Sequence, residues 1–228
     1  MKQTLKAECE RLGIALTQEQ IALLCSFGEA LIEKNKVMNL TAITEPEAVA
    51  KLHFADCLAL LNIVDCRNKS VIDVGCGAGF PGVPMKLGEP SIRLTLLDSL
   101  QKRVNWLRET LDSLGVEADC VAARAEEYAA REQFDIATSR AVARLNVLAE
   151  LCLPFVRVGG YFLAMKGAAA EEELEEAKHA LNLLGGKPER IAQYEIDGVM
   201  HRVIVVKKVR PTLPAYPSRF AKIKQQPL

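Results

Sequence analysis

The chain lacks a long apolar run, which excludes a membrane-spanning helix from the sequence. No stretch of its 228 residues approaches the roughly 20 consecutive apolar residues that cross a bilayer. The N-terminal stretch MKQTLKAECERLG alternates charged and apolar residues and has no apolar centre of the kind that a secretory signal requires. We therefore expect a cytoplasmic protein.

Paired cysteines are also missing. The seven cysteines are an odd number, lie scattered along the chain and form no Cys-x-x-Cys pair, and no histidine stands at ligand spacing from them. In a cytoplasmic protein this pattern favours free thiols over disulfides or a zinc site. We expect no bound metal.

The chain has no net charge, because 29 basic residues balance 29 acidic ones. The charge is nevertheless uneven, since no acidic residue follows Asp197. The segment beyond it carries seven cations, with Tyr216 and Phe220 among them: Arg202, Lys207, Lys208, Arg210, Arg219, Lys222 and Lys224. Such a segment can bind a polyanion, although a solvated tail has the same composition.

The order of apolar runs predicts an α/β fold. From residue 70 onward, short β-branched or aliphatic runs alternate with helical stretches such as 100–114 and 168–184. The runs predict strands at 70–74, 93–98, 118–123, 134–138, 161–166, 188–196 and 201–208. This alternation indicates a Rossmann-like, doubly wound sheet of seven strands. Only Asp197-Gly198 and their neighbours separate the last two runs, which predicts a hairpin and hence an antiparallel last strand.

We divide the chain into an N-terminal helical appendage (1–65), the main α/β domain (66–210) and a basic, linker-like tail (211–228). In the appendage, Thr17-x-x-Gln20 and Thr44-x-x-Glu47 each match a capping box that opens a helix. The stretch KNKVMNLTAI (34–43) between them is expected to form a loop packed on the body. Nothing indicates an additional apolar face, so we expect a monomer.

A glycine-rich stretch, VIDVGCGAGFPG (71–82), raises the question of what lies so close to its backbone. Gly77-x-Gly79-x-x-Gly82 matches the fingerprint that binds NAD or NADP. Gly75-x-Gly77-x-Gly79, preceded by Asp73, matches the pattern of S-adenosylmethionine-dependent methyltransferases. A tight turn with no ligand is the third alternative, because glycine also appears wherever a strand turns sharply into a helix.

Three features distinguish these interpretations. Asp98 ends the second predicted strand, where a carboxylate can accept hydrogen bonds from both ribose hydroxyls of either ligand. Asp73 stands next to the turn, where its charge stabilises an ammonium or sulfonium group but repels a pyrophosphate. The reversed last strand is a pattern of methyltransferases rather than of nicotinamide dehydrogenases. The S-adenosylmethionine register is therefore favoured, with Asp73, Gly75, Gly77, Gly79 and Asp98 as predicted cofactor contacts.

The chain carries a set of short motifs in this order: MNLTAI (38–43), HFADCL (53–58), IDVGCGAGFPGVP (72–84), LLDSLQKRVNWL (96–107), SRAVARL (139–145), MKG (165–167) and HRVIVVKK (201–208). Through this set the sequence resembles the RsmG (GidB) family of small-subunit ribosomal RNA guanine-N7 methyltransferases over nearly its whole length. Two departures are Cys57, where the family usually has serine, and Lys34, where a tryptophan often precedes Asn-Lys.

The resemblance implies that Gly75, Phe80, Ala125, Glu126 and Arg140 contact S-adenosylmethionine. Gly75 lets the backbone approach the methionyl part, and Phe80 packs against the cofactor. Ala125 and Glu126 follow the third predicted strand, where the adenine is expected. Arg140, just beyond the fourth, can reach the cofactor carboxylate as a charge-assisted pair, although a surface salt bridge is the alternative.

The implied acceptor is a guanine of 16S ribosomal RNA or of the small ribosomal subunit. Guanine N7 already offers a lone pair, so we expect no general base, and catalysis by positioning and electrostatics. The candidates for a catalytic role are Asn39, His53 and Asp56. The last two are spaced i, i+3 on one helix face, so a buried histidine–aspartate pair that fastens the appendage to the sheet is the alternative.

The RNA has to present an accessible guanine, which indicates a loop or bulge with a splayed base. The predicted phosphate contacts are Lys102, Arg103, Lys166, Arg202, Arg219, Lys222 and Lys224, and ordinary solvation is the alternative for each. Together they predict an affinity that falls steeply with salt. The acidic helix around EEELEE (171–176) is expected to face away from the RNA.

Overall fold

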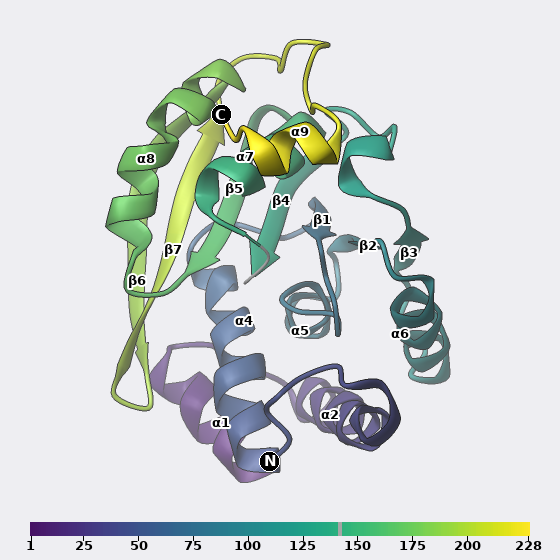
Figure 1. The fold of residues 1–228 in the computed structure, drawn as a ribbon. Helices are drawn as coiled ribbons and strands as arrows, with labels where there is room; N and C mark the ends of the chain where they lie inside the picture. The colour runs from purple at the N-terminus through teal and green to yellow at the C-terminus, as the bar shows by residue number, and fades with distance from the viewer. Residues whose placement is uncertain (141–142) are drawn as a thin grey trace.

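A central seven-stranded sheet lies between two layers of helices in the computed structural model, which describes residues 1–140 and 143–228 (Figure 1). Residues 141 and 142, inside the SRAVARL stretch, lie outside this description. The strands are β1 (Ser70–Val74), β2 (Arg93–Asp98), β3 (Asp119–Ala122), β4 (Phe134–Arg140), β5 (Val156–Lys166), β6 (Gly186–Ile196) and β7 (Val199–Lys208). Among the described helices, none combines the length and the apolar character that crossing a membrane requires.

The strand order is β3-β2-β1-β4-β5-β7-β6, with β1 to β5 parallel and β7 antiparallel to both its neighbours. This confirms the predicted doubly wound sheet with a reversed last strand. The predicted strand positions agree with the structure to within a few residues, except that β5 begins at Val156 rather than 161. Its early part contains Gly159 and Gly160, and a Cβ at Gly160 would lie 2.4 Å from the carbonyl oxygen of Asp135.

Alternating side chains of the strands feed two apolar clusters, one on each face of the sheet. In β7, Val203 and Val205 join the cluster under the N-terminal helices, whereas Ile204 and Val206 join the opposite one. The first face is covered by α1 (Lys2–Arg11), α2 (Gln18–Met38), α5 (Gly82–Gly88) and α6 (Gln101–Ser113). The second is covered by α7 (Leu145–Cys152), α8 (Ala170–Leu183) and α9 (Phe220–Gln225). The N-terminal helices thus share a core with the sheet.

The N-terminal region differs from the prediction at its second helix boundary. The Thr17–Gln20 capping box is present, but α2 continues to Met38, so the loop begins only at the left-handed Asn39. Thr44 does not cap the next helix, α3 (Pro46–Ala48), which starts at a proline behind Glu45. Proline has no N–H to cap and its φ suits the first helical position, so it sets this start. A π-helix, η1 (Val49–Ala55), α4 (Asp56–Leu58) and η2 (Ala59–Asn62) follow directly.

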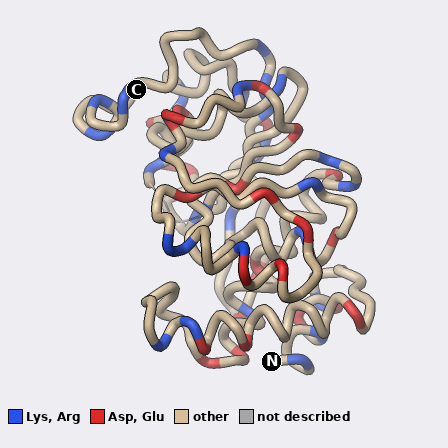
Figure 2. The backbone as a smooth tube through the Cα atoms, turned by 90° about the vertical axis from the view of Figure 1, so that its right-hand side faces the viewer, with Lys and Arg blue, Asp and Glu red and all other residues tan. Residues whose placement is uncertain are grey.

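The basic tail is docked on the body rather than being linker-like as predicted. Its helix α9 buries Ile223 completely in the second apolar cluster. Arg131 donates through Nη1 to the Tyr216 carbonyl at 2.5 Å, and the Ser218 N–H donates to Glu150 Oε1 at 2.7 Å. Figure 2 shows this short C-terminal helix carrying basic residues with no acidic one. Apolar burial and these hydrogen bonds account for the order that its proline content alone does not predict.

Candidate active site

The glycine-rich turn leaves β1 at the carboxyl edge of the sheet. Gly75 and Gly77 adopt φ of 71° and 55°, in the left-handed region that side-chain-bearing residues disfavour. The N–H groups of Gly75 and Cys76 both donate to the Leu97 carbonyl, at 2.8 and 3.1 Å, which ties the turn to β2. The turn is therefore held open beside the ends of β1 and β2, where ligands of parallel sheets bind.

A cavity of about 410 Å³ opens beside this turn, and we call it the glycine-loop cavity. Its walls combine the ends of β1, β2 and β4 with the loop after α2 and the π-helix η1. The residues that line it include Thr41, His53, Gly75, Gly77, Asp98 and Arg140. The volume lies in the roughly 300–1,000 Å³ range of small-molecule sites.

Asp98 is held in a fixed orientation at the end of β2. Its Oδ2 accepts from the Gly77 N–H and its Oδ1 from the Leu100 N–H, both at 2.9 Å. Arg103 Nη1 stands 3.9 Å from the same carboxylate. An ionised carboxylate has about four acceptor positions, so Asp98 keeps acceptor capacity towards the cavity that it lines.

Asp73 is fully buried in β1, and one of its oxygens has no partner. Its Oδ2 accepts from the Gly82 N–H at 2.8 Å, whereas Oδ1 is the one buried side-chain polar atom without a hydrogen bond among the described residues. Burial raises the pKa of Asp73 to about 7 despite that hydrogen bond and the charge of Arg140. A cationic donor placed near Oδ1 would satisfy the free acceptor and favour the ionised form.

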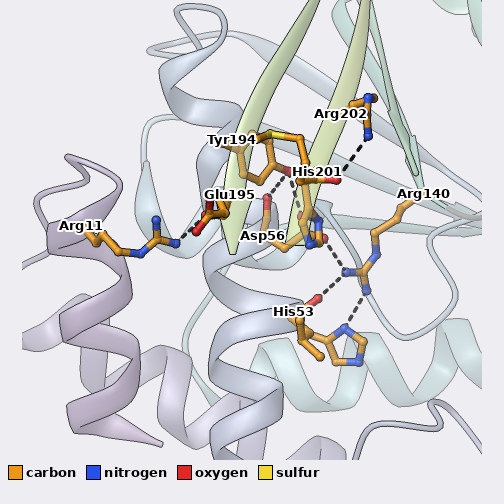
Figure 3. A network of polar contacts seen from close by, with 10 residues as sticks. Arg11, His53, Asp56, Arg140, Tyr194, Glu195, His201 and Arg202 are labelled. Carbon is orange, nitrogen blue, oxygen red and sulfur yellow. Dashed lines mark hydrogen bonds and ion pairs between the residues drawn. The ribbon is translucent and has the colours of Figure 1, made fainter. Parts of the chain in front are cut away.

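Arg140, at the end of β4, joins the sheet to the N-terminal layer (Figure 3). Its Nη1 donates to the Leu52 carbonyl at 3.1 Å and to Asp56 Oδ2 at 3.2 Å, and its Nη2 donates to His53 Nδ1 at 2.9 Å. The guanidinium carbon also lies 4.8 Å from the centre of the Phe80 ring. Arg140 therefore bridges His53 and Asp56, for which a direct buried pair was one of the two interpretations of the sequence.

His53 is a neutral imidazole in this network. Burial and the adjacent Arg140 cation lower the pKa of His53 to about 4. Because arginine only donates, Nδ1 must accept, and the ring proton lies on Nε2, which is 2.8 Å from Thr41 Oγ1. The ring stacks on Phe80 with centroids 4.4 Å apart. Both nitrogens are thus engaged within the protein.

The Asp56 carboxylate is also contacted from a second direction. The Tyr194 hydroxyl donates to its Oδ1 at 2.8 Å, and His201 Nδ1 lies 2.7 Å from the same oxygen (Figure 3). Tyr194 and His201 come from the two strands of the β6–β7 hairpin. The hairpin and β4 therefore fix the same carboxylate.

The structure places four predicted cofactor contacts outside the lining of the glycine-loop cavity: Asp73, Gly79, Ala125 and Glu126. Asp73 is fully buried in β1. Gly79 packs on neighbouring helices, since a Cβ there would lie 2.7 Å from a methyl of Val83 in α5. Ala125 and Glu126 form a short 3-10 turn, η3 (Ala125–Glu127), beyond β3. The catalytic candidate Asn39 also lies outside it, as the exposed C-cap of α2.

Two of the predicted RNA contacts are engaged with the acidic helix α8. The Lys166 ammonium lies 2.7 Å from Glu173 and donates to the Ala143 carbonyl, and Arg202 Nε lies 3.2 Å from Glu171. These cations and the acidic helix therefore occupy the same side of the molecule, contrary to the predicted separation. Arg103 lines the glycine-loop cavity. The remaining predicted contacts have exposed side chains: Lys102, Arg219, Lys222 and Lys224.

A family model described as GidB, rRNA small subunit methyltransferase G, matches residues 20–202. The chain belongs to the GidB family. The ribosomal RNA small subunit methyltransferase G of Alkaliphilus metalliredigens is 43% identical and covers 100% of this chain and 98% of its own. The protein of the same name from Clostridium kluyveri is 41% identical and covers 96% and 95%. The predicted resemblance is confirmed.

Solved structures show the same fold at low sequence identity. A SAM dependent methyltransferase from Aquifex aeolicus has a TM-score of 0.55 and 17% identity, covering 77% of this chain and 97% of its own. TYW2 of M. jannaschii, solved in complex with AdoMet, has a TM-score of 0.55 and 14% identity, covering 66% and 74%. The Rossmann-like methyltransferase fold is confirmed, and GidB membership favours the register of Gly75, Gly77 and Gly79.

Sequence reasoning missed three residues of this GidB site: Thr41, Tyr194 and His201. Thr41 and His201 lie within motifs that carry the resemblance, but nothing in those motifs indicates their contacts with His53 and Asp56. Tyr194 reads as an ordinary strand residue. Only the hairpin register, which pairs Tyr194 with His201, brings both side chains to Asp56.

Proposed function

We propose that this chain transfers the methyl group of S-adenosylmethionine to N7 of a guanine in 16S ribosomal RNA. The observation that carries the proposal is the unpartnered, buried Oδ1 of Asp73 directly before the glycine turn of a GidB chain. A buried acceptor without a donor costs about 1–3 kcal/mol. The ammonium of the cofactor supplies a donor of the right charge.

The other cofactor contacts follow from the elements around the turn. Gly75 and Gly77 leave room for close approach of the backbone, and Asp98 accepts from the ribose hydroxyls. Arg140 has five N–H donors, which leaves capacity for the cofactor carboxylate beside its present partners. We place Phe80 against the cofactor and the adenine near Ala125 and Glu126; Gly79 supports the turn by packing.

When bound, the cofactor supplies an electrophilic methyl group on a sulfonium. The acceptor nitrogen already carries its lone pair, so no residue has to remove a proton. His53 is consistent with this, because its Nδ1 accepts from Arg140 and its Nε2 carries the proton near Thr41. The chain's own residues therefore orient the reactants and stabilise charge.

The acceptor is proposed to be a guanine in a loop of 16S ribosomal RNA, presented as naked RNA or in the small subunit. The exposed cations Lys102, Arg219, Lys222 and Lys224 are proposed to contact its phosphates. Arg103 lines the glycine-loop cavity, and Lys166 and Arg202 lie beside α8. The salt-sensitive affinity, the monomeric state and the cytoplasmic location stay predictions.

The ionisation of Asp73 predicts that S-adenosylmethionine affinity depends on pH. The free protein holds this carboxyl with a pKa of about 7, and only the ionised form attracts an ammonium. Affinity therefore falls about tenfold per unit as the pH drops below about 7, until the lower pKa of the complex is reached. Above pH 7 it holds until the α-amino group of the ligand deprotonates, at about 7.7–8.0 for an ordinary α-amino group. Equilibrium dialysis from pH 5.5 to 7.5 measures the acidic slope.

Asp73→Asn is the matched variant for that measurement. It keeps the size of the side chain and removes the titration, so binding should be weaker and independent of pH across the same range. An unchanged slope in Asp73→Asn would assign the titration to another group and remove Asp73 from the ammonium site.

The function itself is tested by incubating the protein with methyl-labelled S-adenosylmethionine and small subunits from cells that lack this gene. Nucleoside analysis should show labelled 7-methylguanosine at one site. Label in another nucleoside would overturn the proposed acceptor. Cofactor binding without any transfer would separate the methyltransferase fold from the proposed substrate.

A further inference from the structure

A second cavity, of about 540 Å³, lies beside the glycine-loop cavity, and Arg140 lines both. We call it the hairpin cavity, because Tyr194, His201 and Arg202 of the β6–β7 hairpin contribute to its wall. Asp56, from α4, also lines it, in contact with Tyr194. The hairpin cavity therefore exists only where the N-terminal layer, β4 and the hairpin meet.

The hairpin is fastened to the N-terminal layer along its length. Lys51 donates to Asp197 Oδ1 at 2.7 Å at the hairpin turn, and Arg11 donates to the Glu195 carbonyl. Arg190 also donates to the Ile63 carbonyl, at 2.6 Å. These contacts connect residues far apart in sequence, so they position Tyr194 and His201 against Asp56.

The wall of the hairpin cavity contains a carboxylate with a fixed orientation. The Asp56 side chain is only 6% exposed, Arg140 donates to its Oδ2 and Tyr194 to its Oδ1, and His201 Nδ1 lies 2.7 Å from Oδ1. These two hydrogen bonds leave part of its acceptor capacity unused. The second acidic residue of the wall, Glu173, is neutralised by Lys166 at 2.7 Å. Asp56 is itself paired with Arg140, through Oδ2 at 3.2 Å, so its Oδ1, beside Tyr194 and His201, is the carboxylate oxygen that is not paired with the arginine.

The rim of the cavity carries two cations that a phosphate can reach. Arg144 is 58% exposed and pairs with Glu176, and Arg202 pairs with Glu171, both on α8. Exposed pairs of this kind contribute about 0–1 kcal/mol. Charge-assisted, bidentate contacts with phosphate are stronger, so an RNA backbone can displace these carboxylates.

We propose that the hairpin cavity receives the acceptor guanosine, with Asp56 beside the base and Arg144 and Arg202 at its phosphates. This rests on the proposed function. In the transfer, the N7 lone pair forms the new N–CH₃ bond, and the electrons of the broken S–CH₃ bond stay on sulfur. No proton moves, and the base gains one positive charge.

A carboxylate beside the base stabilises that charge more in the transition state than in the ground state, because the base is neutral before transfer. Tyr194 and His201 are positioning residues, since they act by holding the Asp56 carboxylate. The sharing of Arg140 between the two cavities places the base next to the cofactor. In this arrangement, the hairpin and the docked N-terminal layer serve to orient the Asp56 carboxylate.

Single-turnover methylation of unmethylated small subunits tests the proposal. Asp56→Asn keeps the shape and removes the charge, so we expect a rate about 100-fold lower, with S-adenosylmethionine affinity and half-saturating subunit concentration within about threefold. Tyr194→Phe and His201→Gln should slow transfer by about fivefold through a less well-held carboxylate. Arg144→Gln should raise the half-saturating subunit concentration instead of lowering the rate.

The controls are Tyr161→Phe and His179→Gln, which make the same chemical changes on β5 and α8 outside both cavities. A wild-type rate in Asp56→Asn, or a cofactor affinity that falls as far as the rate does, overturns the proposal. If Asp56→Asn does not fold, Tyr194→Phe decides in the same way. Absence of 7-methylguanosine with the unsubstituted chain overturns the proposed function itself.

Discussion

Gly75→Asp should lower S-adenosylmethionine affinity by at least about 100-fold. The substitution places a side chain in the lining of the glycine-loop cavity, at the point where the backbone itself forms the wall. The added carboxylate occupies that space and stands near two other acidic residues, Asp73 and Asp98. Unfavourable juxtaposition of this kind costs several kcal/mol, and each 1.4 kcal/mol is tenfold in affinity. Isothermal titration calorimetry measures the loss.

The fold should survive Gly75→Asp at a modest cost. A residue with a side chain at positive φ costs roughly 1–2 kcal/mol, which lowers the unfolding temperature by several degrees. Gly115→Asp is the matched control, since Gly115 has φ of 67° and open space around it, away from the cavity. Gly115→Asp should lower the unfolding temperature by a similar amount and keep the wild-type affinity for S-adenosylmethionine. Wild-type affinity in Gly75→Asp would remove this turn from the cofactor site.

The fold was largely predictable because its signals are local. Strands buried on both faces read as short apolar runs, such as 70–74 and 93–98, and the turn at Asp197-Gly198 indicates the reversed β7. The glycines of the turn and Asp98 were predictable for the same reason, because the turn comes directly after β1 and Asp98 is the last residue of β2.

The side-chain network was not predictable, because its contacts join residues far apart in the sequence. Nothing near Asp56 indicates that Tyr194 donates to it or that His201 lies beside it, and nothing near Arg140 indicates His53 as its partner. The packing of the tail on the body and the position at which α2 ends were also not predicted. Burial of Ile223 under α7 overrides the proline content of the tail, and a single left-handed residue ends the helix.

Arg140→Ala should weaken S-adenosylmethionine binding and destabilise the fold at the same time. A hydrogen bond to a charged group contributes about 1.5–3 kcal/mol, which predicts a 10- to 150-fold loss of affinity if Arg140 holds the cofactor carboxylate. The same substitution removes a donor from the buried groups Asp56 and His53. Breaking a buried pair on one side costs about 3 kcal/mol of unfolding free energy.

Arg140→Lys separates the two roles of Arg140. Lysine keeps the charge but cannot donate to several partners through a planar fork. It should therefore recover part of the stability, by reaching Asp56, and little of the affinity. Denaturant unfolding and calorimetric titration on the same samples give both quantities.

Arg67→Ala is the control for the loss of an arginine. Arg67 pairs with Asp65 at 2.8 Å, both side chains are exposed, at 72% and 58%, and Arg67 lies outside both cavities. An exposed pair contributes about 0–1 kcal/mol, so stability should change little and cofactor affinity not at all. If Arg140→Ala loses stability but keeps wild-type affinity, Arg140 fastens the N-terminal layer to the sheet without contacting the cofactor. If both stability and affinity fall, Arg140 contacts the cofactor and also holds the N-terminal layer on the sheet.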